Sequence, residues 1–162
     1  QWIHPSAQLV LCAASPDTPA IQAAVAEGVA ALRQHRRGVV WIAEPLTRPE
    51  AVQVLSHASV FVCPSRYEPF GLVNVEAMAC GAAVVATATG GIPEIVEDGV
   101  TGYLVAPGPE FVPALAERIN ALVLDPETAR RFGEAGRQRV LDRFTWPAVA
   151  AQTADLYRKV LR

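Results

Sequence analysis

Short hydrophobic runs that alternate with segments of helical spacing constrain this chain more than any other feature of its sequence. The runs are rich in β-branched residues and occupy residues 8–13, 38–43, 60–64, 83–87 and 102–105. Because they are almost continuously hydrophobic, they predict strands buried on both faces of a parallel sheet. The segments between them predict helices at residues 19–35, 49–58, 71–79 and 92–96. This alternation is typical of βαβ units.

After residue 105 the pattern changes to helices alone, each opened by Pro or by an Asp or Thr cap, at residues 109–123, 126–143 and 146 to the end. The chain has 162 residues, of which 51% are hydrophobic, and this suffices for one sizeable core. We therefore predict a single α/β domain, residues 1–162, with a Rossmann-like doubly wound parallel sheet and a helical C-terminal tail.

The charge balance argues against nucleic acid and anionic membranes as partners. The chain has 14 Lys and Arg residues and 16 Asp and Glu residues, so its formal net charge is -2. A protein that binds nucleic acid needs a basic surface. The chain holds no run of about 18 apolar residues, and its first residues lack the order of a signal peptide, so we expect a cytoplasmic protein. The three Cys residues form no CxxC pair and the three His residues show no ligand spacing, so we predict no metal site.

Polar groups gather after the run at residues 60–64, where an open parallel sheet binds its ligands. Gly71 stands at a predicted helix start, where first-turn N–H groups and the helix dipole attract phosphate or sugar oxygens. Phe70, Gly71 and Leu72 are therefore candidate backbone donors. Glu68 in the loop and Glu76 in the helix can accept hydrogen bonds from hydroxyls. A nucleotide sugar carries two sets of neighbouring hydroxyls, and each of the two carboxylates could bind one set.

A structural interpretation of the same two carboxylates stays open here. Glu68 can cap the helix, and Glu76 can lie on a solvated helix face. Against this, Glu76 is flanked by Val75, Ala77 and Met78. An unpaired carboxylate in apolar surroundings is costly unless a ligand or a donor satisfies it.

A second glycine-bearing turn, residues 87–94, follows the next hydrophobic run. Gly90 and Gly91 allow the main chain to approach a ligand closely, and Pro93 suits the first turn of a helix. An ordinary βα turn explains the same residues. Because both glycine-bearing turns belong on the same edge of the sheet, their coincidence favours a binding site.

These motifs resemble those of a known family. Glu68 and Glu76 match the E-x7-E pattern of the family 4 retaining glycosyltransferases, which have the GT-B fold, and the resemblance to their donor-binding half is continuous from Val60 to Val105. The segments LVLCAASPDTP and VVWIAEPL resemble the actinobacterial glycogen synthase type. The resemblance implies a hexosyltransferase that needs no obligatory metal or other cofactor. Such an enzyme transfers glucose from ADP-glucose or UDP-glucose, with retention, to an α-glucan or glucose 1-phosphate type acceptor.

The same resemblance assigns roles to the site residues. Glu68 would be the catalytic residue and contact the donor sugar near the reacting centre, while Glu76 would hold the ribose hydroxyls. The turn after Ile42 would lie near the base. The leaving diphosphate must be stabilised by positive charge. The other residues implied beside the sugar and the phosphates are Phe70, Gly71 and Leu72, through their backbone amides, and Thr89, Gly90 and Gly91.

The sequence departs from the family at its start. Nothing before Gln8 matches the family's G-R-L…K-G segment, and Arg66 does not occupy the family's basic position. We therefore expect a fragment that lacks the N-terminal acceptor domain and the first strand, and that is inactive alone. Because the first strand is central in the doubly wound order, we predict one of two arrangements. Either the strand at residues 9–13 pairs with that at residues 60–64, or chains form a homo-oligomer through unpaired edges.

Other functions are weighed on the same residues. A dinucleotide-binding module of an oxidoreductase needs G-x-G-x-x-G after its first strand, and residues 14–17 do not supply it. A UDP-sugar epimerase of the same two-domain fold stays open, as does a non-catalytic domain that kept the fold and lost its ligand. The two glutamates and the glycine turn weigh against such a loss.

Overall fold

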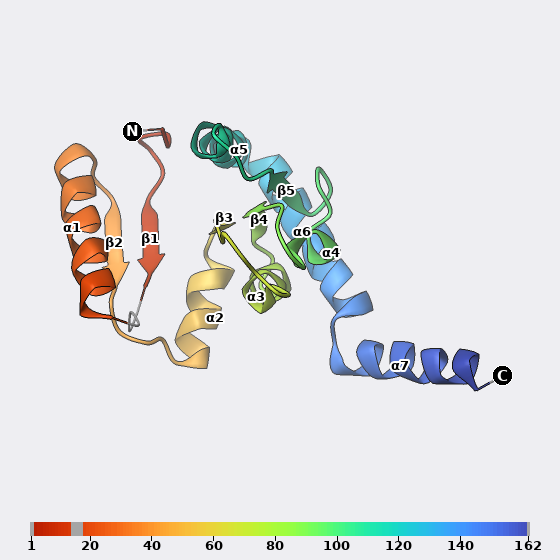
Figure 1. The fold of residues 1–162 in the computed structure, drawn as a ribbon. Coiled ribbons are helices and arrows are strands. Elements are labelled where there is room, and N and C mark those ends of the chain that lie inside the picture. The colour runs from red at the N-terminus through yellow and green to blue at the C-terminus, as the bar shows by residue number, and fades with distance from the viewer. Residues whose placement is uncertain (1, 14–17, 162) are drawn as a thin grey trace. The chain divides into compact units, whose positions relative to one another are not determined.

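The chain forms two compact units, Gln1–Gln53 and Val54–Arg162. The computed structural model, drawn as a ribbon in Figure 1, describes residues 2–13 and 18–161. Residues 14–17, where the sequence lacks the dinucleotide motif, lie outside the described residues. Each unit has its own parallel sheet, of two strands in the first and three in the second.

The first unit is a βαβ arrangement. β1 (Leu9–Cys12) pairs in parallel with β2 (Val39–Ile42), and α1 (Pro19–His35) connects them. α1 begins where the sequence predicts because the Thr18 hydroxyl accepts a hydrogen bond from the Ile21 N–H at 3.2 Å. The local signals of helix start and strand run are therefore sufficient to place these three elements.

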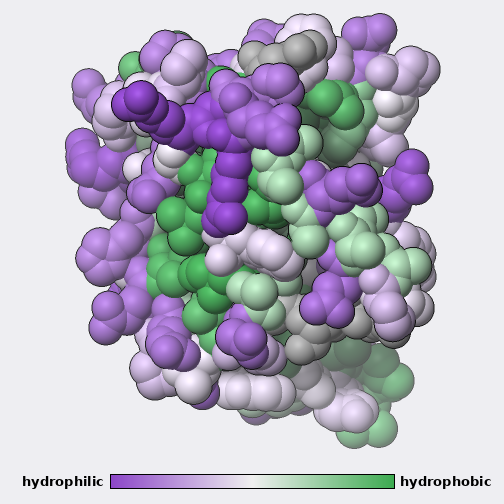
Figure 2. Space-filling model, turned by 90° about the vertical axis from the view of Figure 1, so that its left-hand side faces the viewer, coloured by the Kyte–Doolittle hydropathy of each residue, from purple (hydrophilic) through white to green (hydrophobic). Residues whose placement is uncertain are grey.

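The strands of the first unit are less buried than predicted. Val10 is 46% exposed and Val40 is 38% exposed, and β1 alternates between half-buried and exposed residues. Within this unit α1 packs against β2, and no residue of either strand is buried. Hydrophobic residues therefore reach the surface of this unit. Figure 2 shows one face of the molecule, on which green hydrophobic areas lie among purple hydrophilic residues.

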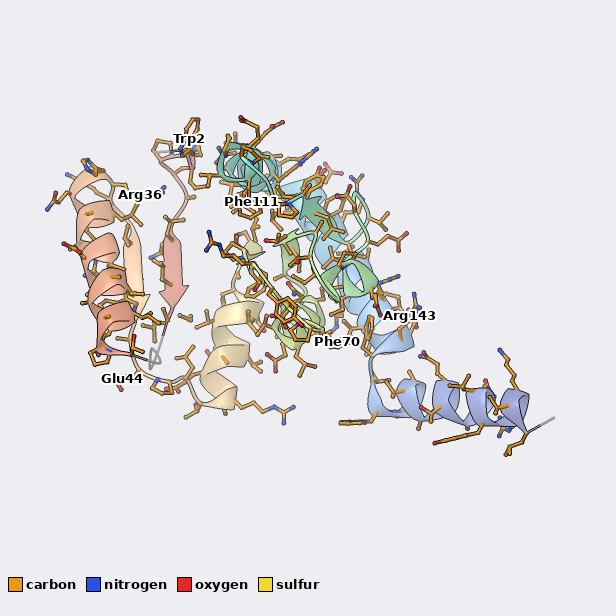
Figure 3. The ribbon with its side chains drawn as sticks, in the orientation of Figure 1. Trp2, Arg36, Glu44, Phe70, Phe111 and Arg143 are labelled. Atoms are coloured by element: carbon orange, nitrogen blue, oxygen red, sulfur yellow. The ribbon has the colours of Figure 1, made fainter. Side chains whose placement is uncertain are left out.

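Arg36 ties the N-terminal segment to the first unit. It follows α1, as Figure 3 shows. Its guanidinium donates hydrogen bonds to the carbonyl oxygens of Ile3 at 3.4 Å, His4 at 3.2 Å and Ala7. These bonds fix the segment that leads into β1.

The second unit contains a parallel sheet in the order β3-β4-β5. β3 (Val60–Cys63) and β5 (Gly102–Val105) flank β4 (Ala83–Thr87). All residues of β4 are buried, so among the described strands β4 alone meets the prediction of burial along its whole length. β3 ends one residue before the predicted boundary because Pro64 has no N–H for the ladder.

Helices link and cover these strands. α2 (Arg48–Ser56) precedes β3, α3 (Leu72–Ala79) joins β3 to β4, and α4 (Ile92–Ile95) joins β4 to β5. α3 ends at Ala79, and two residues later the Gly81 N–H donates to the Met78 carbonyl at 2.9 Å. This closing turn, with glycine in the left-handed region, is a common helix terminator.

Two longer helices complete the second unit. α5 (Phe111–Leu124) contacts all three strands, and α6 (Pro126–Arg143) contacts β4, β5 and α3. α6 lies very close to the turn before β4, since a Cβ at Gly133 would be 2.0 Å from the Gly81 carbonyl oxygen. The main hydrophobic core lies between these elements and consists of Cys63, Ala77, Met78, Ala82, Val84, Ala86, Ile92, Ile95, Val96 and Val140.

The last helix, α7 (Trp146–Val160), is exposed along its length. It begins after Thr145, whose hydroxyl accepts a hydrogen bond from the Ala148 N–H at 3.4 Å. None of its residues is buried, and Trp146 is 87% exposed. In the described part of the chain, no helix has the length and apolar character needed to span a bilayer.

The predicted fold class is confirmed, with parallel strands, connecting helices and a helical C-terminal tail, and the helices lie within two residues of their predicted bounds. The predicted pairing of residues 9–13 with residues 60–64 would join the two units, and it stays a prediction. β1 pairs with β2, and β3 pairs with β4. In each unit the pairing follows the helical crossover to the next strand, so β1 and β3 begin separate sheets. Association of chains through unpaired edges stays a prediction.

Candidate functional site

The loop between β3 and α3, residues 64–71, leaves the carboxyl end of β3. It ends at Gly71, whose φ of +104° is a left-handed conformation that favours glycine. A Cβ at this position would lie 2.8 Å from Asn74 Nδ2 and 3.4 Å from Glu68 Cγ. Gly71 is therefore required both for its backbone conformation and for its lack of a side chain.

The N-terminus of α3 carries no side-chain cap from the described residues, although Gly71 occupies the cap position. The N–H groups of a first turn have no acceptor within their own helix. At this turn Leu72 is 66% exposed and Val73 is 45% exposed. With the helix dipole, these N–H groups can bind phosphate or hydroxyl oxygens. The interpretation of Glu68 as the cap of this helix is wrong.

The turn between β4 and α4 packs directly against the β3–α3 loop. The Gly91 N–H donates to the Glu68 carbonyl oxygen at 3.1 Å, and the Thr89 hydroxyl donates to the Arg66 carbonyl oxygen at 3.5 Å. Gly90 has a φ of +52°, and a Cβ there would lie 1.8 Å from the Glu68 carbonyl oxygen. The two glycine-bearing turns therefore meet at one edge of the sheet, as the sequence predicts.

The glycine pair has a structural purpose that the sequence does not reveal. The prediction is that Gly90 and Gly91 let the main chain approach a ligand. In the structure, the neighbouring loop fills the space beside them: a Cβ at Gly91 would lie 2.6 Å from the Pro69 carbonyl oxygen and 2.8 Å from Phe70 Cα. The pair thus holds two main-chain segments in contact. A direct role of these glycines toward a ligand stays a prediction.

The two carboxylates differ in burial. Glu68 is half-buried in the loop, whereas Glu76 lies on an exposed side of α3. The prediction that Glu76 sits in apolar surroundings is wrong, because successive helical residues point about 100° apart. Its neighbours Ala77 and Met78 are fully buried and face the core. The Glu76 carboxylate is therefore accessible, four residues after the first residue of α3.

Two buried polar side chains adjoin these turns, and sequence reasoning missed both. Asn74 is fully buried and its Nδ2 donates to Cys63 Sγ at 3.6 Å, but its Oδ1 has no partner among the described residues. Thr87, the last residue of β4, is 2% exposed and its hydroxyl likewise has no partner there. An unpaired buried polar group costs about 1–3 kcal/mol. The available signal was that each interrupts an otherwise apolar run.

Exposed hydrophobic side chains border the site. We call Tyr67, Leu72 and Val73, which are 79%, 66% and 45% exposed, the rim residues. Phe70, labelled in Figure 3, is 39% exposed, and its ring meets that of Phe144 edge-on with centroids 6.1 Å apart. Apolar and aromatic surface beside a few polar groups is common around small-molecule sites.

Two further predictions concern Arg66 and residues outside these turns. The turn after Ile42 belongs to the first unit, and its place near the base stays a prediction. Arg66 is exposed, and of its polar groups the carbonyl takes part in the contact between the turns. Across residues 2–13 and 18–161, no group of three or more His, Cys, Asp or Glu side chains is placed to hold a metal ion.

The match to a known family covers this site. The model for the family described as glycosyl transferases group 1 matches residues 37–139, more than half of the chain. The chain belongs to this family. The matched range of the group 1 glycosyl transferases includes Glu68, Glu76 and both glycine-bearing turns. Membership confirms the resemblance to GT-B glycosyltransferases on which the sequence prediction rests.

Individual members of the family show the same likeness. The chain is 54% identical to an α-maltose-1-phosphate synthase of Mycobacterium tuberculosis over 159 residues, which are 94% of this chain and 41% of that protein. It is 41% identical to a glycogen synthase of the same organism over 112 residues, 69% of this chain and 27% of that protein. The crystal structure of Anabaena HepE in complex with UDP and glucose has a TM-score of 0.80 and 26% identity, and the match covers 97% of this chain and 42% of HepE. The chain thus spans less than half the length of each of these three proteins.

Proposed function

We propose that this group 1 glycosyl transferase domain binds the nucleotide sugar ADP-glucose or UDP-glucose. We further propose that the protein transfers the glucose, with retention, to an α-glucan or glucose 1-phosphate type acceptor. One observation carries the proposal: the uncapped N-terminus of α3 lies against the Gly90–Gly91 turn. This contact brings backbone N–H donors and the Glu68 loop to one edge of the sheet. Glu76 follows one turn into the same helix.

Each part of this edge suits one part of the donor. The first-turn N–H groups of α3 suit the diphosphate, because they combine free donors with the positive end of a helix dipole. Glu76, exposed and one turn further on, suits the ribose hydroxyls. Glu68, held beside Gly91, suits the hydroxyls of the sugar near the bond that breaks. We propose that no metal is required, so that Arg or Lys side chains complete the neutralisation of the leaving diphosphate.

Similarity to named relatives supports the choice of donor and acceptor. The two Mycobacterium tuberculosis proteins are named for the synthesis of α-maltose 1-phosphate and of glycogen. HepE was crystallised with UDP and glucose, and its fold matches nearly the whole of this chain. These likenesses favour a glucose donor over other sugars.

The test is titration calorimetry on the protein expressed from its complete gene. ADP-glucose and UDP-glucose are titrated into the wild type, Glu76→Ala, Glu68→Ala and Glu117→Ala. Glu117 is an exposed glutamate on α5, outside the site, and serves as the control. One donor should bind to the wild type, and Glu76→Ala should weaken it about 10- to 100-fold, since hydrogen bonds to a charged group are worth about 1.5–3 kcal/mol.

Product analysis completes the test. Glu68→Ala should abolish transfer while the nucleotide still binds, and Glu117→Ala should behave as the wild type. If neither donor binds to the wild type, the proposal is wrong and the domain has kept its fold without this ligand. If the donor binds and only an epimerised nucleotide sugar is released, the enzyme is an epimerase instead.

A further inference from the structure

Arg139, on α6, binds the carboxyl end of α4. Its Nε donates to the Ile95 carbonyl oxygen at 2.8 Å, and one terminal nitrogen donates to the Glu94 carbonyl oxygen at 3.0 Å. The other terminal nitrogen pairs with Glu97 Oε2 at 3.1 Å. The Arg139 side chain is 18% exposed, whereas that of Glu97 is 54% exposed, so the bond to the Ile95 carbonyl is the one that is partly shielded from solvent. A guanidinium suits this position because its donors are fixed in one plane.

α4 connects Arg139 to the candidate site. The helix has four residues, Ile92–Ile95, and so short a helix depends on tertiary contacts for its order. At its other end, the Gly91 carbonyl accepts from the Glu94 N–H at 3.0 Å, and the Gly91 N–H donates to the Glu68 carbonyl at 3.1 Å. A continuous series of hydrogen bonds therefore runs from Arg139, through one helical turn, to the backbone of Glu68.

α6 is itself fixed independently of α4. Gly133 allows α6 to lie against the Gly81 carbonyl, and a Cβ at Gly136 would lie 3.3 Å from Met78 Cγ. Val140, adjacent to Arg139, is 6% exposed and belongs to the main core. The backbone that carries Arg139 is thus anchored by packing that would survive loss of the guanidinium.

We propose that Arg139 is a positioning residue for the donor site. By holding the carboxyl end of α4, it keeps the Gly90–Gly91 turn against the Glu68 loop and so sets the place of Glu68 relative to the donor sugar. The inference rests on the proposed function, because it assigns the sugar to this edge. It concerns the sugar rather than the nucleotide, since Glu76 lies on α3 and outside the hydrogen-bond series.

The variants separate positioning from general stability. Arg139→Met keeps the aliphatic stem and removes every donor, whereas Arg139→Lys keeps the charge and part of the hydrogen bonding. Arg130→Met is the matched control, because Arg130 is on the same helix and pairs with Glu134 within α6, with both side chains 65% exposed. All are compared with the wild type in the protein expressed from its complete gene.

Two readouts are measured. Calorimetry gives the dissociation constants of the nucleoside diphosphate and of the nucleotide sugar, with ADP and ADP-glucose or UDP and UDP-glucose as the probes. Residue-resolved hydrogen exchange follows the amides of Gly91 and Glu94, with Val85 in the centre of β4 as the reference. Loss of folded protein lowers the binding stoichiometry but leaves the ratio of the two dissociation constants unchanged.

Arg139→Met should raise the dissociation constant of the nucleotide sugar about tenfold, since a small displacement of a positioned group has effects of this size. The dissociation constant of the free nucleoside diphosphate should change less than about twofold. Exchange at Gly91 and Glu94 should rise about tenfold with Val85 unchanged, Arg139→Lys should recover part of both effects, and Arg130→Met should match the wild type.

Equal weakening of both ligands, or a fall in stoichiometry alone, would overturn the inference while leaving the proposed function in place. So would unchanged exchange at Gly91 in Arg139→Met. A wild type that binds neither ligand would overturn the proposed function and with it the positioning role.

Discussion

Replacement of Gly90 by alanine is the sharpest perturbation of the contact between the two glycine-bearing turns. Gly90 has a φ of +52°, and an added Cβ would lie 1.8 Å from the Glu68 carbonyl oxygen and 2.9 Å from the Glu68 carbonyl carbon. Real Cβ contacts are essentially never shorter than 3.0 Å, so one main-chain segment must move. The nearest atoms are backbone, so no flexible side chain can make way.

The magnitude follows from two terms. A left-handed backbone conformation costs an alanine about 1–2 kcal/mol, and forcing an atom into a filled space typically costs about 1–3 kcal/mol. Gly90→Ala should therefore lower the free energy of unfolding by about 3 kcal/mol. Gly99→Ala isolates the first term, because Gly99 has a φ of +74° and nothing within 4 Å of its added Cβ. The free energy of unfolding of this control should fall by about 1 kcal/mol.

The assay is urea unfolding followed by far-ultraviolet circular dichroism, with the wild type, Gly90→Ala and Gly99→Ala measured in parallel. The free energies of unfolding are compared as differences at a common slope. If Gly90→Ala loses no more stability than Gly99→Ala, the turns are not held as closely as the structure shows, and the reasoning on the site edge fails.

Two further predictions concern single polar side chains. Thr87→Val should leave the free energy of unfolding unchanged or raise it by up to about 1 kcal/mol, because the Thr87 hydroxyl is buried without a partner among the described residues; a loss on urea unfolding would show that the hydroxyl is satisfied. The hydrogen bond from the Thr128 N–H lowers the pKa of Asp125 below its ordinary 3.8. A carboxyl group whose pKa is lower in the folded state stabilises the protein at pH values above its unfolded-state pKa. This stabilisation is lost as the pH falls through the folded-state pKa. The stability advantage of wild type over Asp125→Asn, which keeps the helix cap, should therefore vanish between about pH 5 and about pH 2; an advantage that does not change with pH would contradict this.

Local sequence signals placed most of the fold. The bounds of β4, β5 and α6 match the prediction, because each has a strong local signal: a hydrophobic run, or a Pro with an Asp cap. The division into two units and the exposure of Val10 did not follow from local signals. They depend on which elements pack against each strand, which a hydrophobic run does not specify.

The candidate site was predictable in its parts and less so in its contacts. Gly71 at a helix start and the shared edge of the two turns followed from periodicity and sheet topology. The sequence pattern mispredicts the surroundings of Glu76, because neighbours in sequence are not neighbours on a helix surface. The hydrogen bonds from Arg139 to Glu94 and Ile95 join residues more than 40 positions apart in the sequence, so no local sequence pattern predicts them.

The filled space beside Gly71, Gly90 and Gly91 limits how recognition can vary. Any side chain at these positions collides with main chain or with Asn74. These three glycines, which we call the floor of the site, therefore accept few substitutions. The rim residues Tyr67, Leu72 and Val73 are partly or largely exposed, so we expect their side chains to tolerate exchange better than the three glycines do. We expect preference among ligands to diverge at the rim, while the floor beneath is inherited almost unaltered.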